Sequence, residues 1–317
     1  MKLSLGDKLA IWFIKRVNSN PERKDKVVKK MKFHYMLATR FLRHRVKKGY
    51  IKTIENADIC PIEIYKQKNS TSKKVIYIVH GGGFIMGLIN TYRNLVYPFS
   101  KATNDAIIAL TDYRTAPKHQ YPSAHDDVMS GYKYLLSIGY SPKDIIFFGD
   151  SSGGNLILST LLKLKDEGAE MPKGAVVMSP WADLMASGKS YKDNYNKDAI
   201  FGRKHTKKSV SDEIKMERIL ASGLFSYAND ADKSNKYLSP VYGEYDNMPP
   251  MLMIVGDSEM LLDDTLTIVK KIEDSGGEVE LHIGQGMFHG YPLFYNVSKQ
   301  AKIAFEKVLK FIKKHTE

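Results

Sequence analysis

Residues 145–156 read IIFFGDSSGGNL, and apolar residues at helical spacing continue to Leu164. An apolar strand therefore runs into a G-x-S-x-G turn and then into a helix, which is the context that a nucleophile elbow requires. Glycines on both sides of Ser151 let the strand and the helix approach closely, and they let the serine adopt a strained conformation with an exposed hydroxyl. The first helical turn directs free N–H groups and a positive dipole end at the space beside Ser151. The stretch predicts a nucleophilic serine.

A serine hydroxyl reacts only when a neighbouring base removes its proton and a third group orients that base. Two acids, Asp257 and Glu259, follow a predicted strand that ends at Val255, and His289 lies in the loop after the next predicted strand. The order serine, acid, histidine is that of the α/β-hydrolases. Because loops at the carboxyl ends of neighbouring strands can converge, we expect His289 and one of these acids to meet Ser151.

A glycine-rich loop, His80-Gly81-Gly82-Gly83-Phe84, follows the apolar strand predicted for residues 75–79. A tetrahedral intermediate needs fixed donors about 2.7–3.1 Å from its oxyanion. Consecutive glycines let backbone N–H groups face a substrate without intervening side chains, so the loop predicts an oxyanion hole. The alternative is a dinucleotide-binding turn with Asp112 on the ribose, but the spacing departs from G-x-G-x-x-G and Ser151 is left unexplained.

The composition excludes several classes of protein. Of the 317 residues, 43% are hydrophobic, as in a globular protein with a sizeable core. The N-terminal apolar run 9–14 is shorter than a signal-peptide core, and no run approaches the roughly 18 residues of a membrane span. Cys60 is the only cysteine, and the nine histidines include no H-E-x-x-H spacing. We therefore expect a cytoplasmic protein with no disulfide, no metal and no cofactor.

The net charge of +13 is concentrated at the N-terminus. Residues 1–50 carry 15 Lys or Arg and three acids, which leaves +1 for the other 267 residues. Because the remainder is electrically balanced, we expect no nucleic-acid partner. Residues 3–17 and 21–48 both show amphipathic helical patterns. We favour helices packed on the main domain with a solvated lysine face; weak contact with a membrane or lipid surface is the alternative.

Strands alternate with helices along the rest of the chain, which predicts a mostly parallel central sheet covered by helices on both faces. We expect strands at 50–55, 62–66, 75–79, 106–110, 145–148, 175–178, 251–255 and 278–283. We expect helices at 92–102, 124–138 (capped by Ser123), 156–164, 263–274 and 298–314.

The alternation stops in a polar segment, residues 182–247, with one predicted helix at 211–228. An insertion at this point lies above the carboxyl ends of the strands, over the ligand crevice. We therefore predict a hydrolase core of residues 50–181 and 248–317, a cap insertion of residues 182–247, and N-terminal basic helices (residues 1–49) that form part of the cap.

Five motifs together resemble the hormone-sensitive-lipase-like esterases, α/β-hydrolases that include bacterial carboxylesterases and arylacetamide deacetylases. The motifs are His80-Gly81-Gly82-Gly83-Phe84, Tyr113-Arg114-Thr115-Ala116-Pro117, Gly149-Asp150-Ser151-Ser152-Gly153-Gly154-Asn155, Ser179-Pro180-Trp181 and Gly286-Met287-Phe288-His289-Gly290. The resemblance runs from about Val75 to the C-terminus. It implies an α/β-hydrolase fold with a helical cap, Ser151 as nucleophile, His289 as base, and an oxyanion hole formed by Gly82, Gly83 and the N–H of Ser152.

Two positions depart from the family pattern. Ser152 stands where the family usually has alanine, which matters little because only the backbone N–H is needed. The family's Asp-Pro-Leu-x-Asp segment aligns with residues 259–263, so the resemblance puts Glu259 in the place of the catalytic acid. Asp257 is the alternative acid because it lies only two residues away.

Other residues of these motifs have structural interpretations. We expect Arg114 to pair with Asp126 or Asp127 and to hold the loop that follows it. We expect His80 to brace the glycine-rich loop and Asp150 to bond neighbouring backbone.

These observations predict a cofactor-free serine carboxylesterase that cleaves short- to medium-chain esters, small-molecule substrates, through an acyl-enzyme. The alternatives are an amidase or deacetylase of the same fold and a dinucleotide-binding oxidoreductase. The sequence leaves monomer and homodimer open.

Overall fold

The computed structural model describes residues 3–18, 44–202 and 226–317. In these residues eight strands form one sheet in the order β1-β2-β4-β3-β5-β6-β7-β8. The first three strands of that order pair antiparallel, and the remaining pairs are parallel. The strands are β1 (Tyr50–Ala57), β2 (Cys60–Gln67), β3 (Val75–Val79), β4 (Ile107–Thr111), β5 (Ile145–Asp150), β6 (Gly174–Met178), β7 (Met251–Gly256) and β8 (Val279–Gly284). The mostly parallel α/β-hydrolase sheet predicted from the sequence is confirmed.

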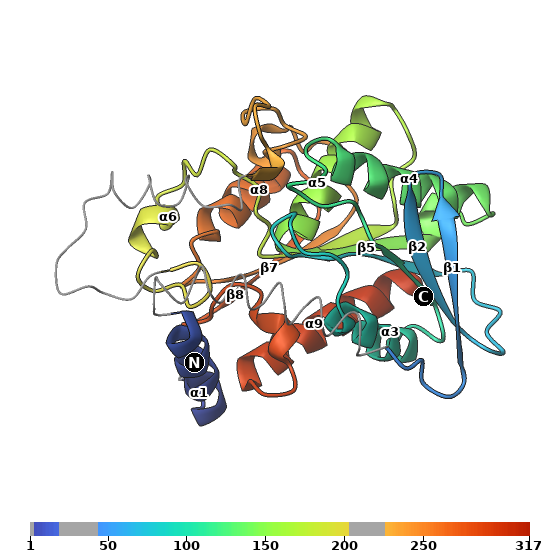
Figure 1. Ribbon diagram of the computed structural model, residues 1–317, viewed down its shortest axis with the longest axis horizontal. Helices are drawn as coiled ribbons and strands as arrows, with labels where there is room; N and C mark the ends of the chain where they lie inside the picture. Colours follow the sequence, from blue (N-terminus) through green and yellow to red (C-terminus); the bar gives the residue numbers. More distant parts are fainter. Residues whose placement is uncertain (1–2, 19–43, 203–225) are drawn as a thin grey trace.

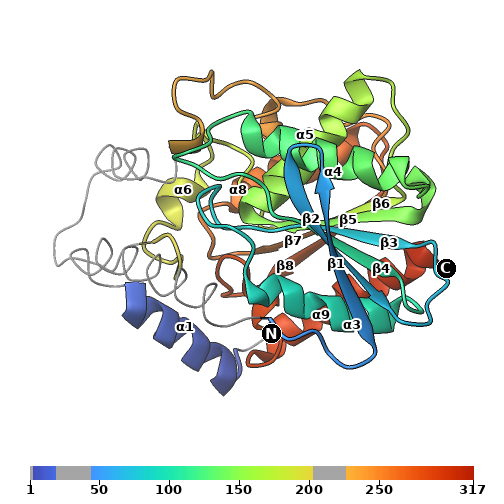
Figure 2. The same ribbon diagram turned by 45° about the vertical axis from the view of Figure 1, so that its right-hand side comes forward.

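Helices cover both faces of this sheet, as the alternating pattern predicts (Figures 1 and 2). Helices α3 (Asn90–Ala102) and α9 (Lys299–Thr316) lie on one face. Helices α4 (Ser123–Ser137), α5 (Ser151–Asp166) and α8 (Leu262–Asp274) lie on the other. The shorter elements are α6 (Ser190–Asp193), η1 (Pro142–Asp144), η3 (Pro240–Tyr242) and η4 (Tyr291–Phe294).

The central strands are buried on both faces because side chains alternate across a sheet. In β3, Val75, Tyr77 and Val79 join the apolar core under α4, α5 and α8. Ile76 and Ile78 of the same strand join the core under α3 and α9. All five residues are buried, which accounts for the uninterrupted apolar run in the sequence.

The carboxyl ends of β3, β5, β6, β7 and β8 lie at one edge of the sheet because these neighbouring strands run parallel. The loop that starts at His80, the turn at Ser151 and the loops bearing Glu259 and His289 all leave from this edge. In parallel α/β sheets this edge is where ligands bind.

Helix α1 (Leu5–Asn18) packs at the start of α9 (Figure 1). The buried Asp7 carboxylate accepts hydrogen bonds from the Ser298 hydroxyl and, at 3.3 Å, from the Gln300 N–H. An acid at a helix N-terminus meets free N–H groups and the positive end of the helix dipole. This contact fastens α1 to the start of α9. Among the described residues, none of the helices combines the length and the apolar character needed to cross a membrane.

Most element boundaries match the sequence-based expectations within two residues, and α5 starts five residues earlier, at Ser151 itself. The predicted Ser123 cap is wrong: Ser123 is the first residue of α4, Pro122 precedes it, and no side chain caps the helix. The helix predicted at 211–228 and the basic stretch 21–48 fall largely on residues 203–225 and 19–43, outside the described part of the chain.

Candidate active site

Ser151 lies where β5 turns directly into α5, and its φ angle of 53° is in the left-handed region that a residue with a side chain rarely adopts. The close packing of the turn enforces this conformation. A Cβ atom on Gly153 would overlap the carbonyl oxygen of Val79 at the end of β3. The Trp181 N–H also donates to the carbonyl oxygen of Ser151 at 3.1 Å. Strain of this kind is stored at functional sites when the surroundings over-determine it.

The glycine-rich loop lies against the elbow. The Gly81 N–H faces the Asp150 carboxylate at 3.1 Å and the Tyr92 hydroxyl at 2.9 Å, and Tyr92 donates to Asp150 in turn. Beyond this anchor, Gly82 and Gly83 have φ angles of 121° and 62°. A Cβ on Gly82 would lie 2.7 Å from the Cβ of Met86, so this turn requires glycine.

His80 supports the loop from behind. Its ring stacks on Tyr113 with centroids 4.0 Å apart, and the Tyr113 hydroxyl donates to the His80 carbonyl at 2.8 Å. Its Nδ1 atom lies 2.8 Å from the carbonyl oxygen of Gly81. These contacts agree with a bracing role for the completely buried imidazole.

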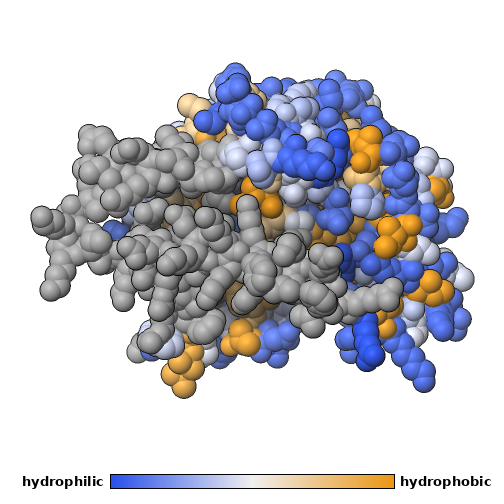
Figure 3. All heavy atoms as spheres, in the orientation of Figure 1, coloured by the Kyte–Doolittle hydropathy of each residue, from blue (hydrophilic) through white to orange (hydrophobic). Residues whose placement is uncertain are grey.

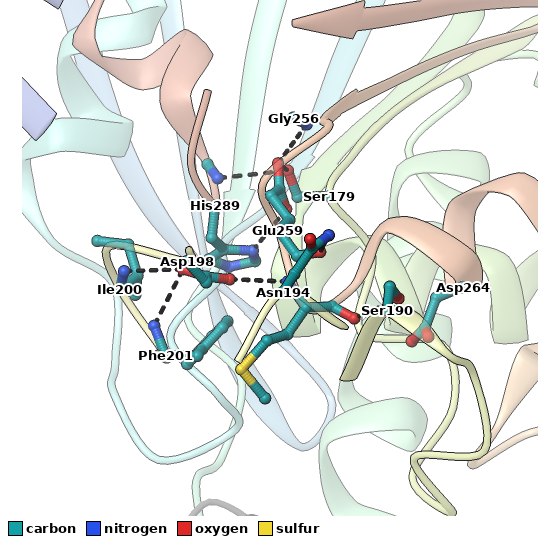
Figure 4. A network of polar contacts seen from close by, with 12 residues as sticks. Ser179, Ser190, Asn194, Asp198, Ile200, Phe201, Gly256, Glu259, Asp264 and His289 are labelled. Carbon is teal, nitrogen blue, oxygen red and sulfur yellow. Dashed lines mark hydrogen bonds and ion pairs between the residues drawn. The ribbon is translucent and has the colours of Figure 1, made fainter. Parts of the chain in front are cut away.

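Glu259 and His289 form a buried pair. The Nδ1 atom of His289 lies 3.1 Å from Oε2 of Glu259 (Figure 4). The other carboxylate oxygen, Oε1, accepts hydrogen bonds from the Gly256 N–H at 2.6 Å and from the Ser179 hydroxyl at 2.8 Å. The Gly256 N–H and the Ser179 hydroxyl thus orient the carboxylate, and the carboxylate in turn orients the imidazole.

The carboxylate of Asp257, the alternative acid, accepts its hydrogen bonds from other groups. Its Oδ1 atom accepts hydrogen bonds from the Gly286 N–H at 2.7 Å and from the Ser258 hydroxyl at 3.0 Å. The Asp257 side chain therefore braces the loop that carries His289, while Glu259 holds the imidazole itself.

Burial and the neighbouring carboxylates shift the pKa of His289 in opposite directions. Burial alone would lower the pKa of His289, but the hydrogen bond and charge of Glu259, with the charges of Asp198 and Asp150, outweigh it and raise the pKa above 6.5. Burial raises the pKa of Glu259, against the hydrogen bond from His289. Burial also raises the pKa of Asp150 to about 6. The Glu259 carboxylate thus favours the protonated imidazole, the form that arises when His289 acts as a base.

Arg114 pairs with Asp127 and not with Asp126. Its guanidinium Nε and Nη2 atoms lie 3.0 and 2.7 Å from Oδ1 of Asp127, and its backbone N–H donates to Oδ2 at 2.7 Å. The Asp127 side chain is completely buried. This pair fixes the loop after β4 to α4, as one of the two sequence-based alternatives predicts.

Three residues near the pair were not singled out from the sequence. Asn194 and Asp198 lie in the polar insertion and bind the loop around Glu259, and the Phe201 ring lies 4.5 Å from the His289 ring. The four-residue spacing of Asn194 and Asp198 was the one available signal, since it places both on one side of a helical turn.

Within residues 3–18, 44–202 and 226–317, no group of three or more His, Cys, Asp or Glu side chains could hold a metal ion.

The chain is similar to known proteins in both sequence and structure. A family described as "alpha/beta hydrolase fold" matches residues 75–293. An esterase from Acinetobacter venetianus is 33% identical over 261 residues, which cover 82% of this chain and 81% of that protein. An acetyl-hydrolase from Streptomyces hygroscopicus is 28% identical over 257 residues, which cover 81% of each chain. The crystal structure of EstE7, a hormone-sensitive-lipase homologue from a metagenome library, superposes with a TM-score of 0.81 at 26% identity and covers both chains completely.

Proposed function

This chain belongs to the hormone-sensitive-lipase-like family of α/β-hydrolases and is a serine carboxylesterase, and we propose that Ser151, His289 and Glu259 are its catalytic triad. The observation that carries the proposal is the buried 3.1 Å contact between Glu259 and His289 at the sheet edge where β5 ends in the strained Ser151. The strained φ angle and the order of the three residues along the chain support the same assignment.

In this mechanism Ser151 Oγ attacks the carbonyl carbon of the ester while His289 Nε2 takes the hydroxyl proton. Glu259 accepts the Nδ1–H bond, which keeps Nε2 free as the base and stabilises the imidazolium that forms. The tetrahedral intermediate collapses, the alkoxide leaves with the proton from His289, and an acyl-serine remains. Water, deprotonated by His289, attacks the acyl carbon, and the carboxylic acid leaves as Ser151 regains its proton.

The N–H groups of Gly82, Gly83 and Ser152 form the oxyanion hole in this proposal. Gly82 and Gly83 have the positive φ angles of a tight turn, and the loop is fixed to the elbow through Gly81 and Asp150. Ser152 lies in the first turn of α5, where N–H groups have no helical partner. Donors held rigidly around a developing charge lower the barrier most.

We propose that residues 182–247 and the N-terminal segment 1–49 cap this site. Phe201, in the first described part of the insertion, packs on His289. Tyr227, in the second described part, stacks on Phe84 of the glycine-rich loop with centroids 4.2 Å apart. Leu3 lies near Gly286 of the histidine loop: a Cβ on that glycine would be 3.1 Å from its side chain.

The substrates are small-molecule esters, and we propose that short to medium acyl chains are preferred. Aromatic side chains lie close to His289 and to the glycine-rich loop, where they would narrow the space for a long acyl chain. The similarity to an acetyl-hydrolase points the same way. Amide hydrolysis by the same triad is the second candidate, because the acyl-enzyme route is common to both bonds.

Both proposals are tested with p-nitrophenyl esters of increasing acyl length and with the matching p-nitroanilides. We expect the highest kcat/KM for acetate to hexanoate, much slower anilide cleavage, and loss of all activity in Ser151→Ala. A preference for chains longer than decanoate would contradict the chain-length proposal, and anilides cleaved faster than esters would favour the amidase.

We also propose that α1 contacts anionic lipid surfaces. Leu5, Leu9 and Trp12 are 74%, 55% and 55% exposed and share one face of the helix, while Ile11 packs towards the core. Residues 1–50 carry 15 basic and three acidic side chains, which suits an anionic surface. The test is sedimentation with phosphatidylcholine vesicles that contain or lack phosphatidylglycerol. We expect binding that needs phosphatidylglycerol, falls with salt and is lost in Leu5→Glu/Leu9→Glu; equal binding to both vesicles would contradict it.

A further inference from the structure

The polar insertion supplies the side chains that hold the loop bearing Glu259. The Ser190 hydroxyl donates to the carbonyl oxygen of Met260 at 2.7 Å. The Asn194 amide donates to the carbonyl oxygens of Asp257 and Glu259 at 3.0 and 2.8 Å. The backbone of the acid loop is therefore fixed by residues more than sixty positions earlier in the chain.

Asp198 completes this set of contacts, four residues after Asn194. Its Oδ2 atom accepts the Met260 N–H at 2.9 Å, directly after Glu259. Its Oδ1 atom accepts the N–H groups of Ile200 and Phe201 at 2.8 and 3.1 Å (Figure 4). The residue is 3% exposed. One buried carboxylate thus joins the acid loop to the backbone that carries Phe201.

The Phe201 ring lies against the His289 imidazole, with centroids 4.5 Å apart and a tilt of 48°. Glu259 fixes the imidazole through Nδ1, and the ring of Phe201 limits its rotation from a second side. Asp198 holds the loop that bears Glu259 and the backbone of Phe201 together. It therefore fixes the Glu259–His289 contact and the Phe201–His289 contact relative to each other.

The charge of Asp198 acts on the same imidazole. Three carboxylates influence His289, in decreasing order Glu259, Asp198 and Asp150, and each raises its pKa against the effect of burial. The attack of Ser151 turns His289 into a cation, so a fixed negative charge nearby is worth more in the transition state than in the resting enzyme. The charge of Asp198 also raises the pKa of Glu259. In the resting enzyme it therefore disfavours the ionised form of Glu259.

We propose that Asp198 is a positioning residue of the esterase reaction, which aligns Glu259 and Phe201 on His289 and stabilises the imidazolium. This inference rests on the triad proposed above and assigns a second buried acid, from the insertion, to that site. Asp198 does not touch the reacting atoms in this proposal; it acts through the residues that do.

The test compares Asp198→Asn, Asp198→Glu and the matched control Asp193→Asn, which removes an exposed charge from the same short segment. Asparagine keeps an acceptor for Ile200 and Phe201, but it loses the charge and the acceptor for the Met260 N–H. We expect kcat for p-nitrophenyl butyrate to fall about 10- to 100-fold, as for small misplacements of catalytic groups, with a much smaller change in KM. The acid limb of the kcat/KM profile should move to lower pH in Asp198→Asn and return towards wild type in Asp198→Glu. The control should match wild type.

An unchanged kcat and pH profile in Asp198→Asn would overturn the proposal. So would an acid limb that moves equally in Asp198→Asn and Asp198→Glu, since the effect would then not follow the charge. Asp198→Ser is the second neutral variant, and failure of both neutral variants to fold would make Asp198 a structural anchor only. Phosphonate labelling of Ser151 in the wild-type enzyme tests the triad separately, so the two failures are distinguishable.

Discussion

The imidazole Nδ1 of His289 lies 3.1 Å from Oε2 of Glu259, although the two residues leave the ends of different strands, β8 and β7. The parallel pairing of these strands, with Val255 opposite Ile283 and Gly256 opposite Gly284, brings the two loops together. The contact joins two different loops, so it depends on the register in which β7 and β8 pair.

This relationship predicts different effects for the two acids. Glu259→Gln removes the charge that holds the imidazole, so we expect kcat/KM to fall about 10³- to 10⁴-fold, as when a triad acid becomes an amide. Asp257→Asn is the matched control, and we expect a loss below about tenfold because it disturbs only the loop behind His289. Kinetics on p-nitrophenyl butyrate measure both, and the reverse order would make Asp257 the acid.

The pH profile follows from the same contact. Because Glu259, Asp198 and Asp150 raise the pKa of His289, the acid limb of wild-type kcat/KM should lie above pH 6.5. Activity falls as the pH drops through the raised pKa of His289, since the protonated imidazole cannot act as a base. Intrinsic fluorescence over the same range checks that the protein stays folded, and an acid limb well below pH 6 would contradict the raised pKa.

Much of this site could be predicted from the sequence, for physical reasons that differ between residues. Ser151 and the glycine loop are encoded by local sterics, so their motifs are short and continuous. His289 and the acid follow from the order of strands in a parallel sheet. Only the register of the family resemblance favoured Glu259 over Asp257, because both side chains leave one loop; in the structure the contacts with His289, Gly256 and Ser179 distinguish Glu259.

The sequence predicts the insertion only as a cap; its contacts with the loop that bears Glu259 could not be predicted. Asn194, Asp198 and Phe201 reach the site through contacts across more than sixty residues of sequence, and a polar segment gives no hydrophobic period from which to place them. The Ser123 cap was wrong for a local reason: α4 starts one residue early, so the serine lies inside the first turn.

The glycine-rich loop, whose N–H groups we propose as the oxyanion hole, should not tolerate a side chain at Gly82. Gly82→Ala adds a Cβ that meets Met86 and requires a φ angle of 121°, so the loop must move. We expect kcat to fall about 10²- to 10³-fold, the loss seen when an oxyanion donor is removed. Gly139→Ala is the control, because it adds a Cβ at a φ angle of 97° in open space; it should cost a little stability and no activity. Equal kcat in the two variants would contradict this role.

The Arg114–Asp127 pair should matter for stability more than for chemistry. Arg114→Met leaves the Asp127 carboxylate buried without its cation, so we expect the free energy of unfolding to fall by about 2–4 kcal/mol. Lys118→Ala, at an exposed position in the same loop, is the control. Urea unfolding monitored by fluorescence gives both values, and midpoints equal to wild type in both variants would contradict the prediction.

Asp150 should make stability depend on pH. Its pKa is raised from 3.8 to about 6 in the folded chain, so the folded state keeps a proton that the unfolded state loses. The stability of wild type relative to Asp150→Asn should therefore fall as the pH rises from about 4 to about 6 and then level off. Paired urea titrations at pH 4.5, 5.5 and 7 measure this difference. A difference independent of pH would show that Asp150 is not held protonated.

The most direct test of the central claim is to map the residue that diethyl p-nitrophenyl phosphate labels. The triad predicts one adduct per chain, on Ser151, formed at the same rate at which ester hydrolysis is lost. The Ser151→Ala variant should remain folded and should acquire neither label nor activity. An adduct on Ser152 or any other residue, or wild-type hydrolysis by Ser151→Ala, would contradict the assignment of Ser151 as the nucleophile.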